Sequence, residues 1–167
     1  MNAYCVFCKT AYEEKAAINI NRLYQEAGVR AIAPVRILKE RCRGVVKKVS
    51  KPLMQGYIFI FSELKIDPGM LSPVQDVIKL LRYQNGEYEL LGPDLEYAEF
   101  ISANNGIIGI SDVICEGREV KVLSGPLEDY KGTIIKLDRR KQRVLLRVSL
   151  GGIERDISLS VNILSAV

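Results

Sequence analysis

The most strongly apolar stretch of the chain, Tyr57 to Phe61, predicts a buried strand. Aromatic residues and Ile favour strands, and successive side chains of a strand point to opposite faces. Tyr57, Phe59 and Phe61 therefore share one face, and Ile58 and Ile60 share the other. Because both faces are apolar, this strand is expected in the middle of a sheet that is covered on both sides.

A strand, a helix and a second strand are predicted before it. Residues 3–8 form a short apolar run, and the helical period of apolar residues predicts a helix over 11–27 that ends at Gly28. The segment from Thr10 to Glu13 has the spacing of a capping box, and residues 29–37 predict the second strand. The apolar stripe of the helix is expected to comprise Ala16, Ile20, Leu23 and Ala27, flanked by Ala17 and Tyr24.

The remaining part of this half contains a basic segment, a short helix, a hairpin and a third helix. The basic segment is predicted to turn at Arg43-Gly44, and Asp67-Pro68 has the pattern of a helix start. Residues 77–91 predict a hairpin around Asn85-Gly86. A helix is expected from Gly92-Pro93-Asp94 to about Ala103, so that residues 1–103 form an α+β sandwich.

The pattern changes after this sandwich. Residues 104–111, with paired Asn and two Gly, predict a linker that allows independent motion. From Asp112 the chain alternates short strands and turns, and five strands in residues 112–167 predict a small β-barrel. The clearest strand segments are 118–123, 131–137, 143–150 and 153–159.

Composition argues against an enzyme. The chain has no His, so it lacks the commonest general base and the commonest metal ligand. No phosphate-binding loop, nucleophile elbow or paired-carboxylate cleft is recognisable. Cys5 and Cys8 have a Cys-x-x-Cys spacing, but residues three apart in a strand face opposite sides. We therefore expect no cofactor and no metal.

Charge and hydropathy indicate a cytoplasmic protein with a mild basic excess. Net charge is 24 minus 20, or +4, which is compatible with nucleic acid but too small to prove it. No apolar run approaches the length of a membrane span, and the first residues lack the features of a signal peptide. We expect a monomer with no membrane partner.

Two segments together resemble a known family. Residues 116–134 resemble a KOW motif, in which a strand, Gly125-Pro126, an aromatic residue, Gly132 and a second strand follow one another. The pattern of Tyr4-Cys-Val-Phe7, a helix, a basic hairpin and Leu53-Met-Gln-Gly-Tyr-Ile-Phe-Ile60 resembles the N-terminal (NGN) domain of the NusG family. The resemblance covers nearly the whole chain in the family's domain order.

Departures from the family pattern indicate a specialised paralogue. Met54-Gln55 stands where the family usually has Phe-Pro, and the 77–91 segment replaces a Pro-Gly-Val stretch. Among such paralogues the chain is most similar to LoaP, an antiterminator of long biosynthetic operons that recognises an RNA hairpin. RfaH, whose C-terminal domain can become a helical hairpin, is the less similar comparison, because residues 118–159 alternate as strands do.

The resemblance implies that the N-terminal domain binds the clamp helices of RNA polymerase through an apolar pocket. Tyr57 and Phe59 map onto that pocket, with Tyr4 and Phe7 as further candidates. Ordinary core packing is the alternative for these side chains.

Basic residues gather in two places that suit nucleic acid. Residues 36–51 hold seven Lys or Arg and one Glu and are expected near non-template DNA; residues 136–147 hold six basic residues and one Asp and are expected to contact nascent RNA. A solvated surface is the alternative for both. The candidate residues are Lys136, Arg139, Arg140, Lys141, Arg143, Arg147, Lys121 and Lys131 in the barrel, and Arg41, Arg43, Lys47 and Lys48 in the hairpin.

Two other functions remain open at this point. The chain could be a general NusG-like factor whose KOW domain binds ribosomal protein or Rho. It could also be a ribosome-associated KOW protein.

Overall fold

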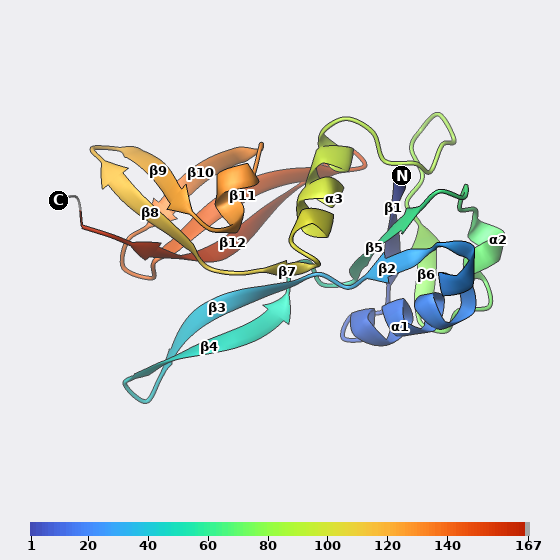
Figure 1. Cartoon of the computed structure of the whole chain (residues 1–167), viewed down its shortest axis with the longest axis horizontal. Helices are drawn as coiled ribbons and strands as arrows, with labels where there is room; N and C mark the ends of the chain where they lie inside the picture. The colour runs from blue at the N-terminus through green and yellow to red at the C-terminus, as the bar shows by residue number, and fades with distance from the viewer. Residues whose placement is uncertain (166–167) are drawn as a thin grey trace. The chain divides into compact units, whose positions relative to one another are not determined.

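The computed structural model describes residues 1–165 and contains two compact units (Figure 1). One unit combines Met1–Pro34 with Met54–Gly106, and the other combines Val35–Leu53 with the chain from Ile107 onward. The predicted α+β class is confirmed: an N-terminal α/β part is followed by a curled β half-barrel. The domain limits 1–103, 104–111 and 112–167 stay a prediction, and residues 166 and 167 lie outside the described residues.

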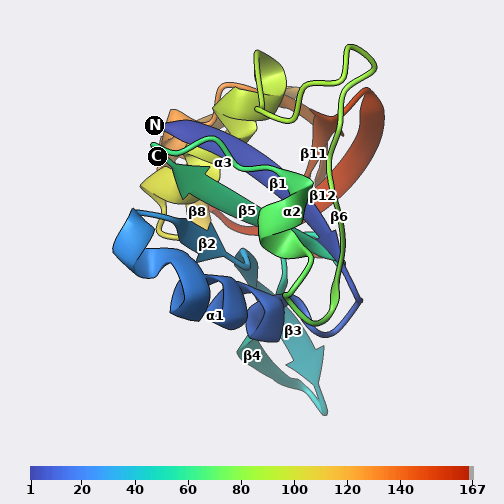
Figure 2. The same cartoon turned by 90° about the vertical axis from the view of Figure 1, so that its right-hand side faces the viewer.

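The first unit is built on a four-stranded sheet in the order β2-β5-β1-β6. β5 lies between two neighbours, and all six of its residues are buried, which confirms the central strand predicted from its two apolar faces. Helix α1 covers one face and α3 covers the other (Figure 2). The strands are β1 (Asn2–Cys8), β2 (Arg30–Ile32), β5 (Tyr57–Ser62) and β6 (Val77–Leu80).

The helices of this unit differ in detail from the prediction. They are α1 (Glu13–Tyr24), the 3-10 turn η1 (Gln25–Ala27), α2 (Pro68–Leu71) and α3 (Pro93–Ala103). Ala16, Ala17 and Ile20 are buried as predicted, but Leu23 is 53% exposed, so its predicted place in the core was wrong. Ala27 is exposed as well, so its predicted place in the core was also wrong. The buried face of α1 is formed by Glu13, Ala16, Ala17 and Ile20, and Leu23 lies beside this face.

The predicted capping box at Thr10 and Glu13 was also wrong. Tyr12 precedes the helix and makes no side-chain cap, and Ala11 has a positive φ of 74°. The Glu13 carboxylate instead accepts a hydrogen bond from the Gly56 backbone N–H at 2.7 Å. A long-range partner therefore replaces the local one, and it fixes the turn that leads into β5. The predicted start of the second helix at Asp67 is confirmed, since its carboxylate accepts from the Met70 N–H.

Two predicted strand segments are divided differently in the structure. The expected strand at 29–37 is split between β2 and β3 around Pro34, which has no N–H to donate. The expected 77–91 hairpin does not form, because only β6 is a strand. The turn itself closes, because the Tyr83 N–H donates to the Glu87 carbonyl. Beyond the turn both arms bond to β1: Leu81 N–H donates to the Cys5 carbonyl and Leu90 N–H to the Ala3 carbonyl.

The second unit contains a curled five-stranded sheet in the order β10-β11-β12-β8-β9. β9 and β10 are the two ends of this order, yet both line one pocket of about 490 Å³, so the sheet curls back on itself. Its apolar interior includes Val113, Val144, Leu146 and Leu159, each at most 2% exposed. The elements are β8 (Ser111–Glu116), β9 (Glu119–Ser124), the 3-10 turn η2 (Pro126–Asp129), β10 (Thr133–Asp138), β11 (Arg143–Leu150) and β12 (Ile153–Ile163).

A long hairpin belongs to the same unit. β3 (Val35–Cys42) pairs antiparallel with β4 (Val45–Pro52), and β7 (Ile107–Ile108) adds to β3 in parallel. The predicted tip at Arg43-Gly44 is confirmed, with φ values of 50° and 79°. Residues 104–111 thus include a strand that is hydrogen-bonded to the hairpin. Within residues 1–165, no helix is long and apolar enough to cross a membrane.

Candidate nucleic-acid interface and partner surface

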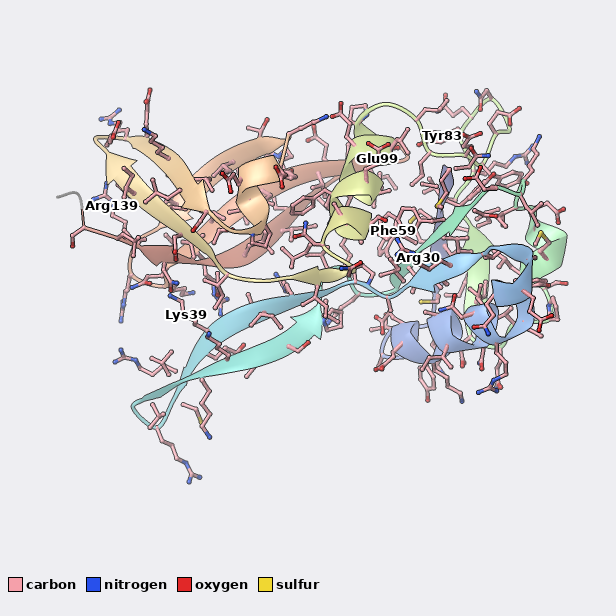
Figure 3. All side chains as sticks on the ribbon, in the orientation of Figure 1. Arg30, Lys39, Phe59, Tyr83, Glu99 and Arg139 are labelled. Carbon is pink, nitrogen blue, oxygen red and sulfur yellow. The ribbon has the colours of Figure 1, made fainter. Side chains whose placement is uncertain are left out.

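The aromatic side chains of β5 form a layer beneath α3. Phe59, labelled in Figure 3, is fully buried. It meets the Tyr97 ring edge-on, with ring centroids 6.0 Å apart. Tyr97 in turn stacks on Phe100 at 6.5 Å. Phe59 therefore acts as core within this unit, and a partner reaches it only through neighbouring side chains.

Phe7 and Tyr57 form the accessible end of this layer, at which Phe7 is partly exposed and Tyr57 is buried. They are neighbours in the β1–β5 register, and their ring centroids are 4.8 Å apart. Tyr57 is 9% exposed, and the Lys79 ammonium lies 5.1 Å from the centre of the Phe7 ring. An aromatic pair flanked by a cation presents a surface with both apolar and charged character.

Tyr4 lies on the other face of the sheet. Its register partner is Ile60, and both belong to the buried cluster that packs around Ala16 and Ile20 of α1. The structure therefore brings together three of the four predicted polymerase-binding residues, and it places Tyr4 apart from them.

The densest basic feature of the barrel is the turn between β10 and β11. Arg139, Arg140 and Lys141 are all exposed there. The Asp138 carboxylate accepts a hydrogen bond from the Lys141 backbone N–H at 2.9 Å, and this bond lowers the pKa of Asp138. An ionised Asp138 thus orders the turn. The Arg139 guanidinium donates to the Gly117 carbonyl at 3.1 Å, whereas Arg140 and Lys141 line a different pocket.

The other predicted basic residues of the barrel are more scattered. Lys121 on β9, Lys131 before β10 and Lys136 on β10 are exposed. Arg147 forms an ion pair with Asp156 at 3.2 Å, which offsets part of its charge locally. Arg143 is only partly exposed, and its guanidinium donates to the Lys39 carbonyl at 3.4 Å.

The basic residues of the hairpin are exposed along its outer half. Arg41, Arg43, Lys47 and Lys48 lie on β3, the tip and β4. Glu40, the only acid of the segment, is paired with Lys51 at 3.1 Å. The net positive charge expected from the sequence is therefore presented to solvent.

Sequence reasoning missed the residues that join hairpin and barrel. The Lys39 ammonium donates to the side-chain oxygens of Gln142 at 2.7 Å and Asn162 at 2.8 Å, and the Lys39 N–H donates to the Ser160 hydroxyl at 3.0 Å. Arg36 adds a bond from its guanidinium to the Ser158 carbonyl. Burial lowers the pKa of Lys39, followed by repulsion from Lys48. These partners are more than a hundred residues apart, and no local pattern indicates them.

The side chains of residues 1–165 offer neither a cluster of metal ligands nor a reactive thiol at Cys5 or Cys8. No group of three or more His, Cys, Asp or Glu side chains within residues 1–165 could hold a metal ion. Cys5 and Cys8 are free and buried. Burial raises the pKa of the Cys8 thiol from 9.0 to about 11, so this thiol stays protonated at neutral pH.

Comparisons with known proteins cover both halves of the chain. Residues 1–98 match the family described as "Transcription termination factor nusG", and residues 116–147 match the KOW motif. The chain is similar to the transcription termination/antitermination protein NusG of Thermus thermophilus, with 23% identity covering 93% of each chain. NusG of Rickettsia prowazekii is 26% identical over 78% of this chain and 69% of its own length.

A solved structure shows the same fold. The structure titled "Domain interaction in Thermotoga maritima NusG" aligns with a TM-score of 0.51 and 22% identity, over 95% of this chain and 93% of its own.

Proposed function

The chain belongs to the NusG family of transcription termination and antitermination factors, and we propose that it binds RNA polymerase and promotes processive antitermination while its KOW barrel contacts an RNA hairpin. The observation that carries the RNA part is the ordered turn with three exposed cations, Arg139, Arg140 and Lys141. We propose LoaP as the paralogue type that this chain represents. The chain would act in the cytoplasm, without an active site or cofactor.

The proposed polymerase surface is the accessible end of the aromatic layer. Phe7 and Tyr57 lie side by side at 4.8 Å, and burying such a pair against apolar side chains of a partner is favourable. Phe59 supports Tyr57 from the same face of β5. Lys79, close to the Phe7 ring, supplies a charge that an acidic partner residue could pair with.

The proposed mechanism is differential binding to two states of the polymerase. A factor that binds the elongating state better than the paused or terminating state shifts the population toward elongation. A shift from 1:99 to 99:1 needs about 5.5 kcal/mol of differential affinity. A tether to the nascent RNA would raise the local concentration of the factor at selected operons without any new polymerase contact.

The RNA part is tested by a gel-shift titration of the full chain with a structured leader RNA taken from beside its own gene. We expect tight binding that survives competitor RNA in the wild type. The variant with Arg139, Arg140 and Lys141 changed to Gln should bind weakly and with a smaller salt dependence. A matched control removes three exposed charges of the first unit, at Lys15, Arg22 and Lys65.

Weak binding that is equal for all RNAs would contradict the RNA part. The chain would then be a general NusG-like factor whose barrel binds ribosomal protein or Rho. Sedimentation with ribosomes in the absence of any polymerase binding would instead identify a ribosome-associated KOW protein.

The polymerase part is tested separately, by retention of the protein on immobilised core RNA polymerase. Phe7→Ala with Tyr57→Ala should lose retention, and Leu91→Ala, a truncation of a side chain that is 60% exposed, serves as the control. Normal retention of a folded double variant would contradict the proposal that Phe7 and Tyr57 bind the polymerase. Proximity of the hairpin to non-template DNA is the remaining part of the proposal, and crosslinking from Arg43 in an elongation complex would test it.

A further inference from the structure

A groove runs between the hairpin and the basic turn of the barrel, and basic residues from both line it. Its volume is about 630 Å³, and its lining includes Lys39 and Arg41 from β3 and Arg140, Lys141 and Arg143 from the turn. The hairpin and the turn lie in the same compact unit. Two segments that are about a hundred residues apart in the chain therefore make one concave basic surface.

The charge of this groove is strongly positive. Five basic residues and one acid, Glu40, line it, which gives a formal net charge of 5 minus 1, or +4. Glu40 is already paired with Lys51 on the neighbouring strand. Because a concave site lined by one sign of charge focuses the electrostatic potential, the groove attracts anions more strongly than separate surface residues would.

The five cations divide into a floor and two rims. Lys39 and Arg143 form the floor, since the Lys39 ammonium bonds to Gln142 and the Arg143 guanidinium bonds to the Lys39 carbonyl. Arg41 is exposed on the hairpin rim, and Arg140 and Lys141 are exposed on the barrel rim. Figure 3 shows Lys39 on the side of the hairpin that faces the barrel. The rims can therefore contact a ligand from two sides.

The chemistry fits a chain of phosphates. Guanidinium groups bind phosphate oxygens through two parallel N–H donors, and Lys adds a point charge. In double-stranded RNA the bases of the deep, narrow major groove are inaccessible, so such a groove would grip the backbone by charge and shape. Val46 adds one exposed apolar side chain to the lining, which suits contact with a sugar or an unstacked base.

We propose that the hairpin and the β10–β11 turn form one composite site, which holds the phosphate backbone of the RNA between Arg41 on one side and Arg140 and Lys141 on the other. This inference rests on the proposed function and extends it, because the RNA site then includes residues of the hairpin and not the barrel alone. The bonds from Lys39 to Gln142 and Asn162 hold the two rims at a fixed separation.

The experiment measures binding of the full chain to a fluorescein-labelled RNA hairpin and to a DNA duplex of the same stem sequence, by anisotropy over a series of KCl concentrations. Arg41→Gln and Arg140→Gln remove one charge from each rim. Arg118→Gln in the barrel and Lys65→Gln in the first unit are matched controls, which remove an exposed charge outside the groove at positions not assigned to nucleic-acid contact.

Each rim variant should weaken RNA binding about threefold to tenfold and reduce the slope of log K against log salt by about one. The controls should change affinity less than about twofold, because they lose only long-range attraction. This pattern, with RNA preferred to the DNA duplex, supports the composite site.

Three results would overturn it. If Arg41→Gln binds as the wild type does and Arg140→Gln binds weakly, the hairpin is not part of the RNA site. The proposed RNA binding by the β10–β11 turn would then remain valid. Equal losses in the rim variants and the controls would indicate diffuse attraction without a groove. Equal and weak binding by all proteins, or preference for the DNA duplex, would overturn the composite site and the RNA part of the proposed function together.

Discussion

Replacing Lys39 with Met should loosen the hairpin from the barrel while the barrel and the first unit remain folded. The substitution keeps a long unbranched side chain but removes the ammonium that donates to Gln142 at 2.7 Å and to Asn162 at 2.8 Å. The Lys39 backbone bond to the Ser160 hydroxyl does not depend on the side chain and should persist. The change therefore removes one defined part of the junction.

The expected loss follows from these two bonds. A hydrogen bond to a charged group contributes about 1.5–3 kcal/mol, so the pair would contribute about 3–6 kcal/mol. Part of this is offset, because burying the ammonium is costly and burial is the main cause of the lowered pKa of Lys39. A net loss of about 2 kcal/mol corresponds to a roughly 30-fold larger population of the undocked hairpin.

Hydrogen exchange measured by mass spectrometry detects this change. A two-stranded hairpin is at best marginally stable by itself, so undocking should expose its amides, and peptides within 35–52 should exchange about 30-fold faster. Peptides that cover β5 should exchange as in the wild type. Lys47→Met is the control, since Lys47 has no side-chain hydrogen bond or ion pair with residues in the described range. Unchanged exchange in Lys39→Met would refute the junction described here.

Three further predictions concern the first unit. Glu13→Ala should lower the free energy of unfolding by about 1–3 kcal/mol in urea titrations, because the buried Gly56 N–H loses its acceptor, whereas Glu13→Gln should lose less; equal losses would contradict this role. Phe59→Ala should cost about 3–5 kcal/mol in the same assay, as expected for a fully buried ring, and a loss below about 1 kcal/mol would show that Phe59 is not core. The folded pKa of the Cys8 thiol, raised by burial to about 11, exceeds the ordinary value of 9.0, so its contribution to stability is complete below pH 9.0 and is lost as pH rises toward 11. The free energy of unfolding should therefore fall across that window, and a Cys8→Ala variant should show a smaller fall.

The positions of the candidate binding residues could be predicted from the sequence where they depend only on neighbouring residues in the chain. Arg139, Arg140 and Lys141 follow one another at a turn between two strands, and consecutive charged residues at a turn are rarely buried. Alternation along β1 separates Tyr4 from Phe7, since residues three apart in a strand face opposite sides. Which of the two shares a face with Tyr57 depends on the register between β1 and β5, and the structure supplies that register.

By itself, the sequence determined the features that depend on short-range patterns. Two apolar faces identified β5 as a central strand, Arg43-Gly44 fixed the tip of the hairpin, and alternation identified the barrel strands. Each of these follows from side-chain period or backbone preference over a few residues.

Only the tertiary structure decided which distant segments meet. Glu13 bonds to Gly56 instead of capping its own helix, and Lys39 bonds to Gln142 across more than a hundred residues. Beyond the turn at Asn85-Gly86, the two arms bond to β1 and do not pair with each other as strands. In each case a polar group has partners of similar chemistry both nearby and far away in the chain, and packing of the apolar core selects between them.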